Sequence, residues 1–336
     1  MRVGISGIGT SVGLGILKSI KDYSKDIFVV GIDNRITAHS YMVNQFTLMD
    51  KVEKLNSRSQ IIKIIKENEI KVLLIASEYE LDWYATFQKE IEEKTQVKIA
   101  VAPIKWIALG NSKEKTYDFL NSINLPIASY FSFHSKKNLW LSGKNQKEIL
   151  TKDDFPAYLK PNKGTSNKGI IYFESEKDLR VYVDNGGNIK DRVLQKSLDI
   201  NSDCIEVTSS IIVDKKGNLP FKPFHARRIL NKGISWTIER INSNYLDKYL
   251  LKTIASMPDY YGSLNMQFIG SEKTGFIPLE INTRFSGTTS FRLACNRNEV
   301  MFVIRDLLEQ DPSELIRQSN TELSRVMHRY VEDFIV

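Results

Sequence analysis

Short apolar runs and longer amphipathic stretches alternate along the first hundred residues. The apolar runs predict strands over Arg2 to Ser6, Ile27 to Asp33, Val72 to Ala76 and Lys98 to Ala102. The stretches between them have helical periodicity, as in the helix expected from about Leu14 to Lys21. Because strands that alternate with helices form parallel sheets, the N-terminal part is expected to be an α/β domain.

The pattern changes in the rest of the chain, where polar and apolar residues alternate one by one. A helix is expected from about Lys113 to Ile123, and the proline of Asn124-Leu125-Pro126 ends it. Strands are then expected over the ranges Ala157 to Pro161, Ile170 to Phe173, Arg192 to Leu198, Glu206 to Asp214 and Phe221 to Arg228. This half is therefore expected to be antiparallel β with flanking helices, with a domain change between Pro103 and Pro126.

One polar row near the C-terminal end stands out. In a strand over Leu279 to Gly287, side chains point alternately to the two faces, so Glu280, Asn282 and Arg284 share one face. The alternate residues Leu279, Ile281 and Phe285 are left to pack against an apolar surface. A carboxylate, an amide and a guanidinium in line are typical of a metal-and-phosphate site.

A second row precedes it, in the segment Ser263 to Ile269. Asn265 and Gln267 point one way there, and the segment Gly270 to Gly275 has the composition of a turn. A hairpin that pairs Gln267 with Glu280 and Asn265 with Asn282 places four oxygen-bearing side chains in one patch. Such hard ligands suit Mg²⁺. The alternative is an ordinary hairpin with one wet face.

Glycines occupy the first expected strand-to-helix turn, Gly7 to Gly13, and Asp33 closes the second strand. Both features resemble a dinucleotide-binding fingerprint, but the spacing is GxGxxxG, and tight turns need glycine with or without a ligand. Glu78 and Glu80 follow the third strand, where they either face a cleft or stabilise a helix N-terminus.

A small-residue loop lies between two of the expected strands. Lys160 ends the first strand, and the loop from Gly164 to Gly169 offers backbone N–H groups to phosphate oxygens. The loop lacks the GK[ST] of a Walker A motif, and a strand follows it instead of a helix. The alternative is a solvent-exposed hairpin turn.

Composition narrows the class of protein. The chain has 336 residues, 42% of them hydrophobic, and a net charge of +7 from 47 basic and 40 acidic side chains. The basic residues are scattered, so no nucleic-acid partner is expected. No apolar run reaches membrane-spanning length, no signal peptide is recognised, and the two cysteines suggest neither a disulfide framework nor a zinc site. A cytoplasmic protein with no membrane partner is expected.

Taken in order, these motifs resemble the ATP-grasp superfamily, in the branch of carbamoyl-phosphate synthase large-subunit domains, biotin carboxylase and the pyrrolysine-biosynthesis ligase. The resemblance rests on Lys160-Pro161…Gly164…Gly169, on Asn265-Met266-Gln267-Phe268 and on Glu280 to Gly287. It implies a Rossmann-like pre-ATP-grasp domain (1–105), a linker helix and small subdomain with a glycine-rich lid (106–190), and a large subdomain with the adenine hinge and metal site (191–336).

The resemblance also implies roles for individual residues. Lys113 and Lys160 would reach the ATP phosphates, although Ser112 stands where the family has an aspartate, and Lys115 is an alternative to Lys113. The lid residues would be Gly164, Thr165, Ser166 and Gly169; the adenine hinge Gln195, Lys196, Ser197 and Leu198; the ribose ligand Glu206; the metal ligands Gln267, Glu280 and Asn282; and the catalytic residues Arg284, Lys160 and Arg228. Arg292 and Glu80 are candidate substrate contacts, and His225 is expected to be structural.

The implied activity is a two-step ligation that uses ATP and Mg²⁺, with Mn²⁺ as an alternative metal. A small-molecule carboxylate would form an acyl-phosphate and ADP, and an amine or related nucleophile would then displace phosphate. The sequence has no recognisable biotin-carrier or glutaminase segment, which favours a small-molecule carboxylate–amine ligase, expected as a possible homodimer. The rival hypotheses are an ATP-binding sensor with weakened catalysis, because of Ser112 and Gln267, and an NAD-dependent oxidoreductase that uses the N-terminal glycines.

Overall fold

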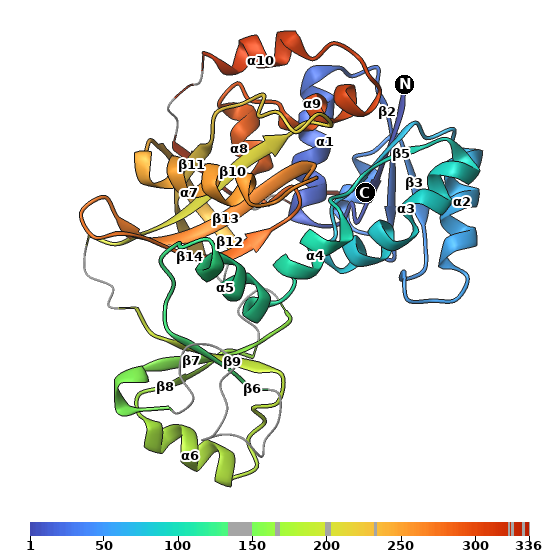
Figure 1. Cartoon of the computed structure of the whole chain (residues 1–336). Helices are drawn as coiled ribbons and strands as arrows, with labels where there is room; N and C mark the ends of the chain where they lie inside the picture. The colour runs from blue at the N-terminus through green and yellow to red at the C-terminus, as the bar shows by residue number, and fades with distance from the viewer. Residues whose placement is uncertain are drawn as a thin grey trace.

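Three sheets organise the chain in the computed structural model, which describes residues 1–133, 150–164, 169–198, 203–231, 234–321, 323, 326–330 and 333–335. Figure 1 shows the first sheet and its helices packed beside the third sheet, while the second sheet and α6 extend away from both. Within the described ranges, no helix has both the length and the apolar character needed to cross a membrane.

The N-terminal sheet is parallel, as its apolar runs predicted, and has the strand order β3-β2-β1-β4-β5. Its strands are β1 (Arg2–Ser6), β2 (Phe28–Asp33), β3 (Gln45–Leu48), β4 (Val72–Ile75) and β5 (Lys98–Ala100). Its helices are α1 (Ser11–Tyr23), α2 (Ser57–Glu67) and α3 (Leu81–Thr95), with short 3₁₀ turns η1 (Ala38–Tyr41) and η2 (Glu78–Glu80). The edge strand β3 was missed because its side chains are half-exposed or exposed and form no apolar run.

Two further helices, α4 (Ile104–Gly110) and α5 (Lys113–Ser122), lead out of this domain. The second sheet has the order β6-β9-β7-β8 and is antiparallel. It contains β6 (Tyr130–Phe133), β7 (Ala157–Pro161), β8 (Ile171–Phe173) and β9 (Arg192–Lys196), with the turn η4 (Lys152–Asp154) and helix α6 (Glu176–Asp184). Because β9 pairs with both β6 and β7, the expected boundary after residue 190 falls too early: the second sheet extends through Lys196.

The third sheet has the order β14-β13-β10-β11-β12-β15 and is also antiparallel. Its strands are β10 (Ile205–Val213), β11 (Phe224–Asn231), β12 (Ile234–Ile241), β13 (Gly262–Ser271), β14 (Gly275–Asn282) and β15 (Val326–His328). The accompanying helices are α7 (Asn244–Ala255), α8 (Thr289–Ala294), α9 (Glu299–Leu307) and α10 (Ser313–Ser319).

The first and third sheets share their apolar core. On one face of the parallel sheet, α2 and α3 pack in a cluster that continues through α4 and α5 to β13 and α7. On the other face, α1 packs with α9, which comes from the far end of the chain. The first domain therefore shares its core with C-terminal residues, and α4 and α5 pack against β14.

Candidate active site

The hairpin of β13 and β14 has the register that the sequence predicted. Asn265 lies opposite Asn282, and Gln267 lies opposite Glu280. A bulge follows Gln267, where Phe268 pairs with Pro278, and it leaves Leu279 half-exposed at a cavity instead of packed in the interior. The strand ends at Asn282, so Arg284 extends the polar row from the segment after the strand.

Amide groups converge on the carboxylate of Glu280. Asn282 donates to its Oε1 over 2.6 Å, and Gln267 donates its Nε2 hydrogen to the same oxygen. The Gln267 Oε1 accepts from Arg228, whose Nε lies 3.2 Å from Glu206. Burial lowers the pKa of Arg228, and the Glu206 and Glu280 carboxylates oppose that effect. The three predicted metal ligands and Arg228 therefore form one connected network.

Arg284 links this network to the N-terminal domain. Its guanidinium donates to Glu78, which is 206 positions away in the sequence and lies in η2, just after β4. The two side chains are only 15% and 20% exposed, so water weakens the pair little. The alternatives left open for Glu78 are thereby decided, because it faces the cleft.

Lys113 comes to the same place from the start of α5. Ser112 caps this helix by accepting from the N–H of Lys115, and its hydroxyl donates to Asn162 over 3.1 Å. The Lys113 ammonium donates to the carbonyl of Gly164 over 3.1 Å, and burial lowers its pKa. Lys115, the alternative cation, is exposed to solvent. The serine therefore retains the helix start that directs Lys113 inward.

Lys160 lies on β7 and donates to the side chain of Gln195 on β9 over 2.5 Å. Burial and the nearby charge of Lys113 lower the pKa of Lys160 to about 8, against the opposing effect of Glu280. Two lysines and one carboxylate thus interact electrostatically across two sheets, and an anionic ligand would stabilise both ammonium groups.

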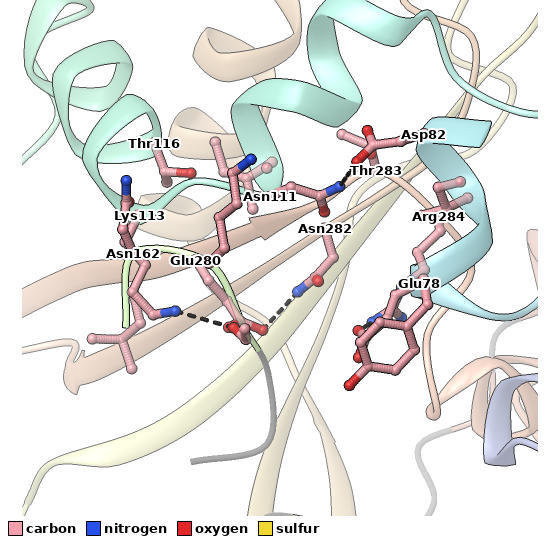
Figure 2. A pocket seen from close by; sticks show the side chains of 17 residues that line it. Glu78, Asp82, Asn111, Lys113, Thr116, Asn162, Glu280, Asn282, Thr283 and Arg284 are labelled. Atoms are coloured by element: carbon pink, nitrogen blue, oxygen red, sulfur yellow. Dashed lines mark hydrogen bonds and ion pairs between the residues drawn. The ribbon is translucent and has the colours of Figure 1, made fainter. Parts of the chain in front are cut away.

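Two cavities meet at the polar row. The first, of about 360 Å³, is lined by Lys113, Asn162 and Gly164 on one side. The second, of about 340 Å³, is lined by α1 residues and the loop after Arg284. Figure 2 shows the first cavity, with Lys113 and Asn162 beside Glu280, and Glu78 beside Arg284. The residues common to both cavities are Glu78, Tyr79, Glu280, Asn282 and Arg284, which form a shared wall.

The predicted adenine hinge lines a third cavity, of about 310 Å³. Lys196, Ser197 and Leu198 contribute to it, with the apolar side chains of Ile269 and Ile277. Gln195 is buried instead and accepts from Tyr117 as well as Lys160. Glu206 does not line any of these three cavities, because its carboxylate pairs with Arg228.

The predicted lid is described only at its ends. Gly164 and Gly169 have φ angles of +132° and +73°, values that favour glycine, so the residue type is explained by the backbone at both positions. Thr165 and Ser166 lie outside the described residues. Arg192 donates to the carbonyl of Gly169 over 2.6 Å and fixes the second end of the loop.

Arg292 was predicted as a candidate substrate contact, and the structure contradicts that prediction. Its side chain is 1% exposed, pairs with Glu299 over 2.6 Å and does not line the cavities of the site. It donates to the hydroxyls of Ser286, Thr288 and Thr289. Arg292 therefore positions the loop that lines the second cavity from behind.

Glu80, the other candidate substrate contact, also lies away from the cavities. It accepts from the hydroxyl of Ser6, which also contacts Tyr84. Burial is the main reason that its pKa rises to about 7, and Asp33 and Glu53 add to the rise. His225 is structural, as expected: its ring nitrogens contact Ser209 and Asp247, and burial lowers its pKa to about 4.

The oxygen atoms at this site could hold a divalent cation only if water or a bound phosphate completed its coordination. Across the described part of the chain, no three His, Cys, Asp or Glu side chains cluster in a way that could hold a metal. Glu280 supplies one carboxylate, and Asn282 and Gln267 supply amide oxygens. The Oδ1 of Asn265, also on this hairpin, is buried without a hydrogen-bond partner. Such a set suits Mg²⁺, which retains water and phosphate oxygens among its ligands.

The chain resembles several known proteins, although no family model matches it. Carbamoyl-phosphate synthase from Methanobrevibacter smithii is 24% identical over 272 residues, which cover 77% of this chain and 69% of that protein. The solved N5-carboxyaminoimidazole synthetase from Staphylococcus aureus has a TM-score of 0.68 at 16% identity and covers 92% of this chain and 77% of its own.

A second solved structure is the biotin carboxylase domain of the Hydrogenobacter thermophilus 2-oxoglutarate carboxylase, in complex with MgADP, ADP and bicarbonate. Its TM-score is 0.69 at 16% identity, and the match covers 92% of this chain and 70% of that one. At such identities, the structural likeness establishes the fold.

Proposed function

We propose that the chain is a member of the ATP-grasp superfamily and an ATP-dependent ligase that joins a small-molecule carboxylate to an amine or related nucleophile. The observation that carries the proposal is the wall of Glu280, Asn282 and Arg284 between two cavities. One cavity carries the cationic groups that phosphates need. The other gives a second substrate access to the same wall.

The phosphate side has the charge that phosphoryl transfer requires. Lys113 lines the first cavity, and Lys160 lies close enough for the charge of Lys113 to lower its pKa. Catalysis of phosphoryl transfer depends mainly on positioning and charge neutralisation. The two lysines would hold the triphosphate against the wall, where Arg284 neutralises charge that develops on the transferred group.

The chemistry then balances in two steps. An oxygen of the carboxylate substrate attacks the γ-phosphorus, the bond to the β-phosphate oxygen breaks, and ADP leaves. The amine nitrogen next attacks the acyl carbon, the acyl–phosphate bond breaks, inorganic phosphate leaves, and the amine loses a proton. Glu78 and Arg284 lie at the junction of the two cavities, where both substrates would meet.

Mg²⁺ is the metal that this site suits. Glu280, Asn282 and Gln267 would hold it, and when bound it would neutralise charge on the phosphate oxygens. For Gln267 to offer its amide oxygen, the hydrogen bond from Arg228 must be shared or exchanged. Arg228 would then be free to contact a phosphate or acyl oxygen.

The adenine would bind in the third cavity, between the second and third sheets. Its walls combine the hinge residues 196–198 with the apolar side chains of Ile269 and Ile277, as a flat apolar ring requires. The two antiparallel sheets would then act as the two subdomains that hold ATP, with the loop between Gly164 and Gly169 as the lid. Glu206 would turn from Arg228 to the ribose when the nucleotide binds.

The proposal is tested by incubating the protein with MgATP, pooled carboxylates and hydroxylamine, which traps acyl-phosphates as hydroxamates. A ligase of this type forms hydroxamate and ADP in equal amounts. AMP and pyrophosphate as products, or ADP formation that no carboxylate stimulates, would contradict the proposal. The carboxylate and the amine themselves, and a homodimeric assembly, remain predictions.

An ATP-binding sensor with weakened catalysis is the second candidate, since Ser112 and Gln267 depart from the family pattern. Two contacts support a working site instead: Ser112 caps the helix of Lys113, and Gln267 contacts Glu280 and Arg228. A sensor would bind MgATP, but no carboxylate would stimulate ADP formation. Any background hydrolysis of ATP would be the same in the wild type and in Glu280→Gln. For the oxidoreductase, NADH fluorescence on titration with the protein gives the corresponding test.

A further inference from the structure

The second cavity contains three guanidinium groups, and only two of them face a carboxylate. Arg228 pairs with Glu206, and Arg284 pairs with Glu78. Arg329 has no carboxylate within ion-pair distance among the described residues; its guanidinium donates instead to the carbonyl of Gly287 over 2.8 Å. No motif surrounds Arg329 in the sequence, so only the structure connects it with this cavity.

The backbone fixes Arg329 firmly in this position. It directly follows β15, and its N–H donates to the carbonyl of Trp236 over 2.7 Å, which continues the pairing of β15 with β12. Five residues later, Phe334 stacks on Tyr41 of the N-terminal domain, with the ring centroids 6.3 Å apart. The last part of the chain thus returns across the third sheet and places a guanidinium at the second cavity.

This guanidinium is partly removed from water, and burial lowers its pKa. A half-buried cation without a counter-ion is unfavourable in the free protein. An anionic ligand would remove that penalty and would form a charge-assisted bond with the remaining N–H groups. Arg329 can therefore form an ion pair with an anionic ligand, because no described carboxylate lies within ion-pair distance of it.

We infer that the second cavity binds the nucleophile substrate through a carboxylate held by Arg329, so that this substrate is an amino acid or another small amino-carboxylate. The inference rests on the proposed function, since it assigns the second cavity to the nucleophile. The carboxylate that becomes phosphorylated is a different group, because it must lie at the wall of Glu280 and Arg284, next to the phosphate side.

The charge count at the cavity favours a carboxylate over a phosphate. After the two ion pairs are formed, the charges left at the cavity are those of Glu280 and Arg329. The proposed Mg²⁺ would bind Glu280, so Arg329 would be balanced by the single charge that a carboxylate carries, whereas a phosphate monoester carries up to two. The remaining polar groups are mainly hydroxyls, which accept or donate without adding charge: those of Thr10, Ser11, Ser77, Tyr79, Thr208, Ser235, Ser286 and Thr288. The volume of about 340 Å³ suits a molecule the size of an amino acid.

The test measures binding to the full-length protein in the presence of MgADP. Thermal-shift assays would screen the twenty amino acids and their matched α-amides, with inorganic phosphate as a further arm, and calorimetry would give dissociation constants for those that bind. At least one amino acid is expected to stabilise the protein, and its amide is not. Arg329→Gln should weaken that amino acid about 10- to 100-fold, as expected for a hydrogen-bonded charge.

Matched variants show whether the effect belongs to this side chain. Arg317→Gln removes the same charge from the exposed face of α10 and should bind the amino acid like the wild type. Arg329→Lys keeps the charge but loses the planar donor pair, so its affinity should lie between those of the wild type and Arg329→Gln. All three variants should bind MgADP within twofold of the wild type, which confirms that they are folded.

Three results would overturn the inference: equal binding of an amino acid and its amide, unchanged affinity in Arg329→Gln, or stabilisation by inorganic phosphate but by no amino acid. None of these results affects the proposed ligase activity. A wild-type protein that fails to bind MgADP would instead overturn the proposed function, and the inference with it.

Discussion

The two cavities on either side of the Glu280–Arg284 wall have nearly equal volumes but different chemistry. The first is bordered by the lysine of α5 and by backbone carbonyl and amide groups near Gly164. The second is bordered by hydroxyls and by three guanidinium groups, of which only Arg329 lacks a carboxylate partner among the described residues, and it includes α1 of the N-terminal domain. The first therefore suits a polyanion, whereas the second suits a small, singly charged molecule.

This difference explains how one row of side chains can serve two reactions. The shared wall lines both cavities, so a group activated from the phosphate side would be presented directly to the second side. The Arg284–Glu78 ion pair joins the hairpin to the parallel sheet at that junction. Substitutions in the wall should therefore impair both steps, whereas substitutions in one cavity should impair one.

The largest effect is expected for Glu280→Gln, because this carboxylate belongs to the wall and accepts from two amides. Carboxylate-dependent ADP formation should fall about 100- to 1,000-fold, the usual size for loss of an electrostatic group at a reaction centre. Glu272→Gln, in the exposed turn of the same hairpin, is the matched control and should keep wild-type turnover. If Glu280→Gln turned over as fast as the control, the shared wall would have no role in the reaction.

Lys160→Met should affect the phosphate side alone. Loss of one charge-assisted contact should weaken MgADP about 10- to 100-fold, measured by calorimetry, while Lys115→Met on the exposed face of α5 should not. Since burial lowers the pKa of Lys160 to about 8, the ammonium is charged below that pH and loses its proton above it. The wild-type affinity for MgADP should therefore fall about tenfold from pH 7 to pH 9.

That decline should be smaller in Lys160→Met, which lacks the titrating group. An equal decline in the two proteins would assign the pH dependence to another group and would place Lys160 outside the phosphate site.

Glu78→Gln should have a moderate effect, since it weakens the link between the cavities but leaves both in place. Arg284 would lose its charged partner, and we expect a loss of about tenfold or less in ligation, because a neutral amide still accepts a hydrogen bond. Nucleotide affinity should change little. Glu93→Gln, on the exposed surface of α3, supplies the control. A loss in MgADP affinity as large as the loss in ligation would contradict a role at the junction.

The smallest effect on activity is expected for Glu80→Gln, since this residue lies away from both cavities. Its effect is on stability: the folded-state pKa of about 7 exceeds the ordinary value of 4.5, so the folded protein binds a proton more tightly than the unfolded chain. That contribution to stability is complete below pH 4.5 and is lost as the pH rises to 7, by up to about 3 kcal/mol. Urea unfolding at pH 5 and pH 7.5 should show this loss in the wild type but not in the variant. Parallel changes in both proteins would refute it.

The sequence predicted the hairpin better than its surroundings, and the reason is physical. Alternation of polar and apolar residues fixes which side chains share a face, and the turn length fixes the register, so the pairs of Asn265 with Asn282 and Gln267 with Glu280 followed from local pattern. The bulge after Gln267 had no such signal, and the position of Leu279 was wrong for that reason.

Long-range contacts were the part that the sequence could not provide. The sequence left two alternative roles open for Glu78, because only the tertiary packing brings it to Arg284. Arg292 was wrong as a substrate contact because it is buried against its partner Glu299 on the next helix, a pairing that the local sequence pattern does not show. Arg329 depends on the return of the chain end along β12, which leaves no local pattern.

The central claim is that a substrate carboxylate is phosphorylated at the shared wall, and isotope transfer tests it most directly. Once the hydroxylamine screen identifies a carboxylate, that acid would be labelled with ¹⁸O and incubated with MgATP and an amine, and the released phosphate analysed by mass spectrometry. The account predicts one ¹⁸O atom in the phosphate from the wild-type protein and scarcely any labelled phosphate from Glu280→Gln. Unlabelled phosphate, or label in AMP, would contradict it.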